Sequence, residues 1–290
     1  MRSFLLAIAL MVATNVQAAD PLVQQLQDVS VTIKAGSGQG SGVLFKRGDT
    51  SYVWTAGHVV DGLRKTRTVI INGSPKVVVE FSDAQIVQEF REDGRRIGEQ
   101  KMEARVLRYS DADQGNDLAL LEVRKKNFSP ATVKFYTGEI PEIGTELYHV
   151  GSLLGQFGAN SLTTGVVSQV GRVLDLGANG IVFDQTTVTA FPGSSGGGVF
   201  LKADGQYMGM LVRGAGDTFN FIVPVRRLRT WAQEAKVEWA MDESIPVPSA
   251  EELAKLPIED AGVEFAGGPN ATNAKKYPFL MLRDEPTPIK

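Results

Sequence analysis

The chain contains no cysteine, and this absence removes several kinds of chemistry at once. Without thiols there can be no disulfide, no thiolate nucleophile, no lipoprotein anchor and no sulfur-ligated metal. Histidine is nearly as scarce, since His58 and His149 are the only two, which excludes a metal site built from several histidines. We therefore expect no metal and no cofactor, and any imidazole chemistry must use one of these two residues.

An excess of positive charge is also missing. The 290 residues carry 30 Lys and Arg against 33 Asp and Glu, a formal net charge of −3. Such a chain has no basic field to attract nucleic acid or anionic lipid, so neither is expected as a partner. The hydrophobic fraction of 43% suits one or two globular domains with a sizeable core.

The N-terminal segment, MRSFLLAIALMVATNVQAAD, lacks the length of a membrane span. Its apolar run from Phe4 to Val12 is far shorter than the roughly 20 residues that a spanning helix needs. A positive residue, Arg2, precedes the run, and small residues at Val16 and Ala18 follow at a cleavage position. The pattern predicts a secretory signal over residues 1–18 and an exported protein, periplasmic or secreted, without stable membrane insertion.

Most of the remaining chain alternates hydrophobic and polar residues, the period typical of β-strands. No alternation of strands with helices is present, so short strands and glycine-rich turns predict an all-β sandwich or barrel. The connector KKNFSPATVKF separates two groups of runs, which predicts two β-domains of similar length. The first group begins with the alternating residues Val29, Val31 and Ile33 and continues with SGVLF, YVWTA, RTVII, KVVVEF and LALLEV. The second group is ELYHVG, TTGVVSQV, GIVFD, GGVFL, YMGMLV and NFIVPV.

A helical pattern follows the second group. Pro224 stands at a helix-start position, and Leu228, Trp231 and Ala235 recur at helical spacing. The spacing predicts a terminal helix over about residues 224–240 that packs on the barrel.

The last fifty residues, 241–290, are proline-rich and mostly polar, so we expect a largely disordered tail. Within this tail only SAEELAKL indicates a helix, because Ser249 and Glu252 have the spacing of a capping box.

Two glycine-rich stretches could carry function. AGSGQGSG at 35–42 lacks the Gly-Lys-Ser/Thr ending of a phosphate loop, and a turn before a strand explains it. In FPGSSGGGVF, glycines flank two serines and would let the backbone of a peptide approach closely. Read in the frame G-x-S-G-G, Ser195 would be the nucleophile, with the amides of Gly193 and Ser195 as oxyanion donors. Taken alone, a flexible Gly/Ser linker would look much the same.

A serine nucleophile needs a base and an acid to orient that base. His58 follows a β-run and neighbours a glycine, so it is well placed to face a cleft. His149 lies inside a strand pattern, where a structural histidine is the better interpretation. Asp117 directly precedes the apolar run LALLEV and would be buried beside a partner, unless it caps its own turn. Asp111 and Asp113 belong to a polar turn.

The segments TAGHVV, NDLALLEV and PGSSGGG resemble the three catalytic motifs of trypsin-like serine proteases, most closely the bacterial HtrA/Deg group. GQGSGVLF and NFIVPVRRLR resemble the opening and closing strands of that domain, and the resemblance covers about residues 28–232. It implies a double six-stranded β-barrel, with barrel 1 at about 28–125 and barrel 2 at about 133–225, inside a peptidase domain at 19–232.

The resemblance also implies roles for individual residues. His58 would be the general base, Asp117 would orient it, and Ser195 would attack a polypeptide substrate to form an acyl-enzyme. The primary substrate pocket would be edged by five residues and, lacking an acid, would take small or medium aliphatic side chains. These residues are Thr189, Met210, Leu211, Val212 and Arg213.

The chain departs from the pattern of that family at three places. Ser194 stands where animal trypsins have an acid, so activation by zymogen cleavage is not expected. Gly198 replaces a proline and predicts a looser segment after the nucleophile. The tail is too short and proline-broken for the PDZ domain that HtrA members carry, so none is expected.

Two alternatives to an ordinary endopeptidase remain open at this stage. One is a catalytically weak or inactive peptide-binding module on the same fold, and the other is a protease with a single dedicated substrate. The oligomeric state is not evident from the sequence.

Overall fold

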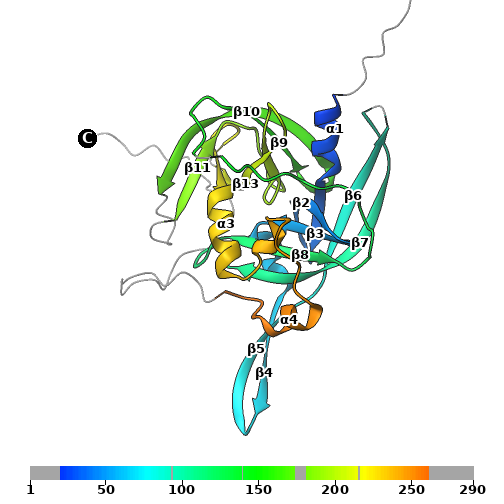
Figure 1. Cartoon of the computed structure of the whole chain (residues 1–290), viewed down its shortest axis with the longest axis vertical. Helices are drawn as coiled ribbons and strands as arrows, with labels where there is room; N and C mark the ends of the chain where they lie inside the picture. The colour runs from blue at the N-terminus through cyan, green and yellow to red at the C-terminus, as the bar shows by residue number, and fades with distance from the viewer. Residues whose placement is uncertain (1–19, 93, 139, 174–180, 215, 261–290) are drawn as a thin grey trace, which may run out of the picture.

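The computed structural model describes residues 20–260 apart from 93, 139, 174–180 and 215. The described chain forms two closed six-stranded antiparallel barrels side by side, with helices at the edges (Figure 1). The predicted double barrel is thereby confirmed. The signal predicted over residues 1–18 lies outside the described residues. No helix in the described part is long and apolar enough to cross a membrane.

The first barrel closes in the order β1-β2-β3-β8-β7-β6. Two of its strands, β6 and β7, come from a charged stretch in which no alternating pattern was evident from the sequence. Its strands are β1 (Ser30–Ala35), β2 (Gly38–Arg47), β3 (Thr50–Thr55), β6 (Ala84–Glu92), β7 (Arg95–Ser110) and β8 (Leu118–Val123).

The second barrel closes in the order β10-β11-β14-β13-β12-β9. All six of its strands coincide with runs expected from the sequence. They are β9 (Glu146–Leu153), β10 (Gly158–Val173), β11 (Val182–Thr186), β12 (Gly198–Leu201), β13 (Tyr207–Gly214) and β14 (Asn220–Pro224).

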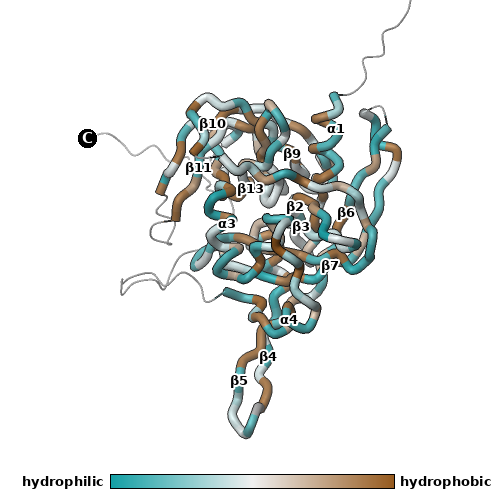
Figure 2. Tube along the Cα trace, viewed as in Figure 1, coloured by the Kyte–Doolittle hydropathy of each residue, from teal (hydrophilic) through white to brown (hydrophobic). Residues whose placement is uncertain are grey.

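The runs RTVII and KVVVEF do form strands, but these strands lie outside both barrels. β4 (Arg64–Ile71) and β5 (Ser74–Phe81) pair only with each other and project from the body as a hairpin (Figure 1). Figure 2 shows hydrophobic segments along this hairpin, and Ile70 and Val77 are 70% and 69% exposed. Alternating hydrophobicity therefore identified the strands but not the sheet to which they belong.

The helices are short. They are α1 (Pro21–Asp28), α2 (Gly57–Val60), α3 (Val225–Glu234) and α4 (Ala250–Lys255), with 3₁₀ turns η1 (Asp61–Leu63), η2 (Gly155–Phe157) and η3 (Glu238–Ala240). The predicted terminal helix is α3, which begins after Pro224 and buries Leu228 and Trp231. It ends at Glu234 and not near residue 240 as predicted, and the separate turn η3 follows.

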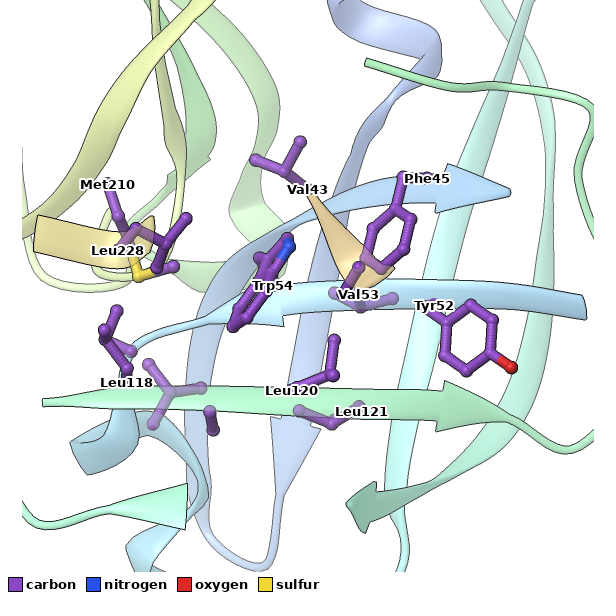
Figure 3. Close-up of a cluster of buried hydrophobic side chains, with 14 of the residues drawn as sticks. Val43, Phe45, Tyr52, Val53, Trp54, Leu118, Leu120, Leu121, Met210 and Leu228 are labelled. Carbon is purple, nitrogen blue, oxygen red and sulfur yellow. The ribbon is translucent and has the colours of Figure 1, made fainter. Parts of the chain in front are cut away.

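The hydrophobic core continues from the first barrel to α3. Figure 3 shows Trp54 among Val43, Leu120 and other strand side chains, with Met210 and Leu228 adjoining them. Trp54 also meets Trp231 edge to face, with ring centroids 5.9 Å apart. All six residues of β3 are buried. The segment after α3 contributes to this covering, since Tyr52 meets Trp239 edge to face with ring centroids 4.9 Å apart.

Residues 241–260 belong to this covering segment rather than to a free tail. Arg47 donates hydrogen bonds to the carbonyls of Asp242 and Ile245, and Tyr109 N donates to Ile258 O at 2.7 Å. The predicted capping box of α4 is present, with Ser249 and Glu252 bonded reciprocally. The expectation of disorder thus does not hold for residues 241–260, and residues 261–290 lie outside the described chain.

Candidate active site

His58 is held where β3 ends and the single turn of α2 begins. The turn packs tightly against the end of β7, because a methyl group at Gly57 would lie 2.2 Å from Ser110 O. Only glycine permits this approach, and the residue after it is carried to the barrel edge. The His58 side chain is 19% exposed there, so it faces a cavity and not the core.

Asp117 lies on the loop before β8 and is 1% exposed. Its backbone is left-handed, with φ at 56°, which is uncommon for a residue other than glycine. The loop is fixed from within, since Asp117 N donates to Asp111 O at 3.2 Å and Asn116 N donates to Ser110 Oγ at 2.6 Å. The carboxylate is thereby directed at His58.

His58 and Asp117 form the pair expected from the sequence. His58 Nδ1 lies 3.0 Å from both carboxylate oxygens, and His58 N donates to Asp117 Oδ1 at 3.0 Å. Burial raises the pKa of Asp117, but the His58 charge and hydrogen bonds, helped by the charge of Arg213, outweigh burial and lower this pKa to about 2. Asp117 is therefore ionised at neutral pH and keeps the proton of His58 on Nδ1, leaving Nε2 free to accept one.

The two adjacent serines have different surroundings. Ser194 is fully buried, and its Oγ accepts a hydrogen bond from Phe191 N at 3.2 Å, so it closes the turn. Ser195 lines the same cavity as His58, a space of about 360 Å³. No hydrogen bond joins Ser195 Oγ to the His58 ring within the described residues. The structure thus brings together the three residues expected to form a triad, with Ser195 and not Ser194 at the cavity.

The turn before Ser195 presents backbone amides of the kind that stabilise an oxyanion. Gly193 has φ at +96°, and a methyl group there would lie 2.4 Å from Ser152 O. A side chain would therefore be both strained and blocked at this position. In the described part of the chain, the amides of Gly193 and Ser195 donate to no other group. Neither amide is therefore committed to an acceptor in this part of the chain, and their role as oxyanion donors stays a prediction.

Comparison with known proteins bears on this arrangement directly. The family model described as the trypsin-like peptidase domain matches residues 40–210, more than half of the chain. The chain belongs to the trypsin-like peptidases. Its matched region includes all three triad positions, so the motifs and the fold lead to the same family.

Within that family the chain is related to the HtrA/Do-like serine proteases. Serine protease Do-like HtrB of Bacillus subtilis (strain 168) is 27% identical over 175 residues, which cover 59% of this chain and 31% of that protein. Serine protease Do-like HtrA of Lactococcus lactis subsp. cremoris (strain MG1363) is 31% identical over 180 residues, covering 60% and 37% respectively. This trypsin-like peptidase therefore spans about a third of the length of these curated relatives.

Solved structures agree on the fold. The serine endoprotease from Yersinia pestis superposes with a TM-score of 0.53 at 21% identity, covering 74% of this chain and 65% of that one. An HtrA-type protease with a tripeptide gives 0.53 at 22% identity, with coverage of 76% and 63%. At these identities the likeness concerns the architecture alone.

His149 is a structural histidine in this trypsin-like peptidase, which is the interpretation that its place in a strand pattern favoured. It is completely buried behind the serine turn, with Nδ1 3.0 Å from Gly198 O. Burial lowers the pKa of His149 to about 4, although the bond to the carbonyl opposes this. The ring is neutral at pH 7 and donates from Nδ1 to that carbonyl.

Gly198 does not loosen the segment after the nucleophile, which corrects the expectation from the sequence. It begins β12 and pairs with Val150 of β9 on one side and Met210 of β13 on the other. The space that a side chain would need is filled by the ring of Phe200, 2.2 Å from the position of a methyl group.

The five expected pocket residues divide into two sets. Val212 and Arg213 line the cavity that contains His58 and Ser195. Met210 and Leu211 are buried among core side chains instead, and Thr189 accepts a hydrogen bond from Thr163 through its carbonyl, away from the lining of this cavity. The preference for aliphatic side chains stays a prediction.

Two arginines that the sequence did not mark as positioning residues tie the second barrel to the Asp117 loop. Arg213 Nη2 donates to Ala112 O at 2.8 Å, and Arg227 of α3 donates to Asn116 O at 2.7 Å and to Asn116 Oδ1 at 3.2 Å. Arg227 also lies over the ring of Phe183, 4.8 Å from its centroid. A basic residue on an amphipathic helix usually faces solvent, so no sequence signal pointed to this contact.

Proposed function

We propose that this trypsin-like peptidase is an exported serine endopeptidase that cleaves polypeptides through an acyl-enzyme. The observation that carries the proposal is the hydrogen-bonded pair of His58 with the buried Asp117, beside a cavity that Ser195 also lines. A neutral imidazole with Nδ1 held by a carboxylate is the general base that a serine hydroxyl requires.

The reaction needs two rounds of proton transfer. In the first, Ser195 Oγ bonds to the carbonyl carbon of the substrate and its proton passes to His58 Nε2. The oxyanion is held by the amides of Gly193 and Ser195, and the C–N bond breaks as His58 returns the proton to the leaving amine. Water then repeats the sequence on the acyl-enzyme and releases the second product.

In the described residues Ser195 Oγ has no hydrogen bond to the His58 ring, and this is compatible with the mechanism. Catalytic hydrogen bonds are often long in the absence of substrate and shorten when the substrate binds. A peptide-binding module without turnover is the competing function, and the experiment below distinguishes the two.

A fluorophosphonate probe tests the proposal, because an activated serine oxygen attacks phosphorus and displaces fluoride far faster than an ordinary hydroxyl does. We expect the wild-type protein to be labelled, and Ser195→Ala and His58→Ala to lose labelling. Peptide binding in a wild-type protein that neither reacts with the probe nor hydrolyses peptides would favour the binding module. A probe-labelled protein that leaves casein intact would indicate a single dedicated substrate.

Export is proposed from the N-terminal sequence alone. The segment Arg2, Phe4–Val12 and Ala18 has the order of a secretory signal. When the full chain is expressed in a bacterium, the mature protein should be recovered outside the cytoplasm with Ala19 as its first residue. An intact Met1 on the cytoplasmic protein would contradict this part of the proposal.

A further inference from the structure

The oxyanion turn depends on a glycine that must be held in place. The two peptide planes that meet at Gly193 Cα could rotate, because glycine adopts positive and negative φ with similar ease. The N–H of Gly193 points opposite to the carbonyl of Pro192, since the peptide bond between them is planar and trans. Whatever fixes the Pro192 carbonyl therefore fixes the direction of the Gly193 amide. The Gly193–Ser194 peptide, which carries Gly193 O, connects that plane to the plane of the Ser195 amide, so fixing it sets the two donors relative to each other.

Each carbonyl of this turn has a donor. Leu154 N donates to Pro192 O at 2.7 Å, and Gly197 N donates to Ser194 O at 2.9 Å. The carbonyl between them, Gly193 O, accepts from the hydroxyl of Ser41 at 2.7 Å. Of the three donors only Ser41 is a side chain, and it comes from β2 of the opposite barrel.

Several atoms of Ser41 form hydrogen bonds at or beside this turn. Ser152 N donates to Ser41 Oγ at 2.7 Å, so the hydroxyl proton of Ser41 is left to point at Gly193 O. Ser41 N donates to Ser195 O at 2.8 Å. Its own carbonyl accepts from Thr55 Oγ1 at 2.7 Å, and the residue is 1% exposed. Ser41 thus contacts the residues on both sides of Ser194 without reaching the cavity.

We infer that Ser41 is a positioning residue for the oxyanion hole. Its hydroxyl holds the Gly193–Ser194 peptide plane and its amide holds the Ser195 carbonyl, so the first barrel, which supplies His58 and Asp117, also sets the donors in the second barrel. The inference rests on the proposed function. The sequence does not predict this role for Ser41, because residues 35–42 show only a glycine-rich turn followed by a strand.

The test compares fluorophosphonate labelling of the wild-type protein, Ser41→Ala and Ser30→Ala. Ser30 is the matched control, because its hydroxyl is also buried and donates to a backbone carbonyl, Leu26 O at 2.8 Å, away from the serine turn. We expect Ser41→Ala to lower the maximal labelling rate by about 10- to 100-fold, somewhat less than the loss of a whole oxyanion donor. Ser30→Ala should keep the wild-type rate.

Two further readouts separate positioning from a general loss of structure. The probe concentration giving half-maximal rate and the midpoint of the pH–rate profile should not change in Ser41→Ala, because the cavity and the His58–Asp117 pair are untouched. If Ser41→Ala does not fold, Ser41→Cys decides, since the thiol keeps the shape but donates weakly, and its rate should also fall.

The outcomes keep this inference distinct from the proposed function. A wild-type protein that is never labelled contradicts the peptidase proposal itself. If the wild-type protein is labelled and both Ser41→Ala and Ser41→Cys react at the wild-type maximal rate, the positioning role of Ser41 is overturned and the peptidase proposal stands. The positioning role is also overturned if Ser30→Ala slows labelling as much as Ser41→Ala does, because the loss would then come from any buried serine hydroxyl.

Discussion

The buried carboxylate of Asp117 should make the stability of this protein depend on pH in a specific way. The folded state lowers the pKa of Asp117 from 3.8 to about 2. Because the folded-state pKa is the lower one, the stabilisation is fully present above about pH 4 and is lost as the pH falls through 2. A drop of that size corresponds to roughly 2 kcal/mol at about 1.4 kcal/mol per pH unit.

The measurement is urea unfolding of the wild-type protein and Asp117→Asn between pH 2 and pH 6. The amide in the variant cannot ionise, so the difference in unfolding free energy between the two proteins should shrink by roughly 2 kcal/mol at the acid end. Asp217→Asn, at an exposed acid, measures the change expected from an ordinary surface carboxylate. A difference between wild type and Asp117→Asn that stays constant with pH would refute the reasoning.

Three other substitutions test separate parts of the structure. Gly193→Ala places a methyl group 2.4 Å from Ser152 O and should displace the turn, slowing fluorophosphonate labelling by about 100-fold or more; an unchanged rate would contradict the requirement for glycine at this position. Arg227→Gln removes charged donors to Asn116 and should lower the urea-unfolding free energy by about 1–3 kcal/mol, whereas no change would mean that these hydrogen bonds do not stabilise the fold. Ser249→Ala removes the cap of α4 and should speed hydrogen exchange over residues 250–255 by an amount equivalent to about 1 kcal/mol; unchanged exchange would contradict the cap.

The sequence predicted the second barrel more fully than the first for a physical reason. Strands β9 to β14 are rich in Val, Phe and Met, and each coincides with a predicted run. The strand β7, RRIGEQKMEARVLRYS, is long, charged and exposed over its first half, so it shows little alternation. The hairpin β4–β5 has the alternation but lies outside the barrel, because pairing partners are decided by contacts distant in sequence.

The candidate site shows the same division. The residues that do chemistry have motifs of their own, and the structure brings His58, Asp117 and Ser195 together as the motifs indicated. The residues that only position the catalytic groups have no such motifs, because their partners are remote in sequence. Ser41, for example, bonds to a carbonyl 152 positions away. β-Bulges also limit what can be predicted from the sequence. A register shift between Leu211 and Arg213 interrupts the alternation of β13, so strict period-two counting cannot assign which side chains reach the cavity.

The most direct test of the central claim is to locate the atom that reacts. Wild-type protein treated with a fluorophosphonate and digested should give a modified fragment spanning residues 191–201, in which tandem mass spectrometry distinguishes the two neighbouring serines. Ser194 is fully buried and hydrogen-bonded within the turn, whereas Ser195 lines the cavity with His58. The account predicts the adduct on Ser195, abolished in His58→Ala and retained in Ser194→Ala. An adduct on Ser194, or one on Ser195 that forms equally well without His58, would contradict it.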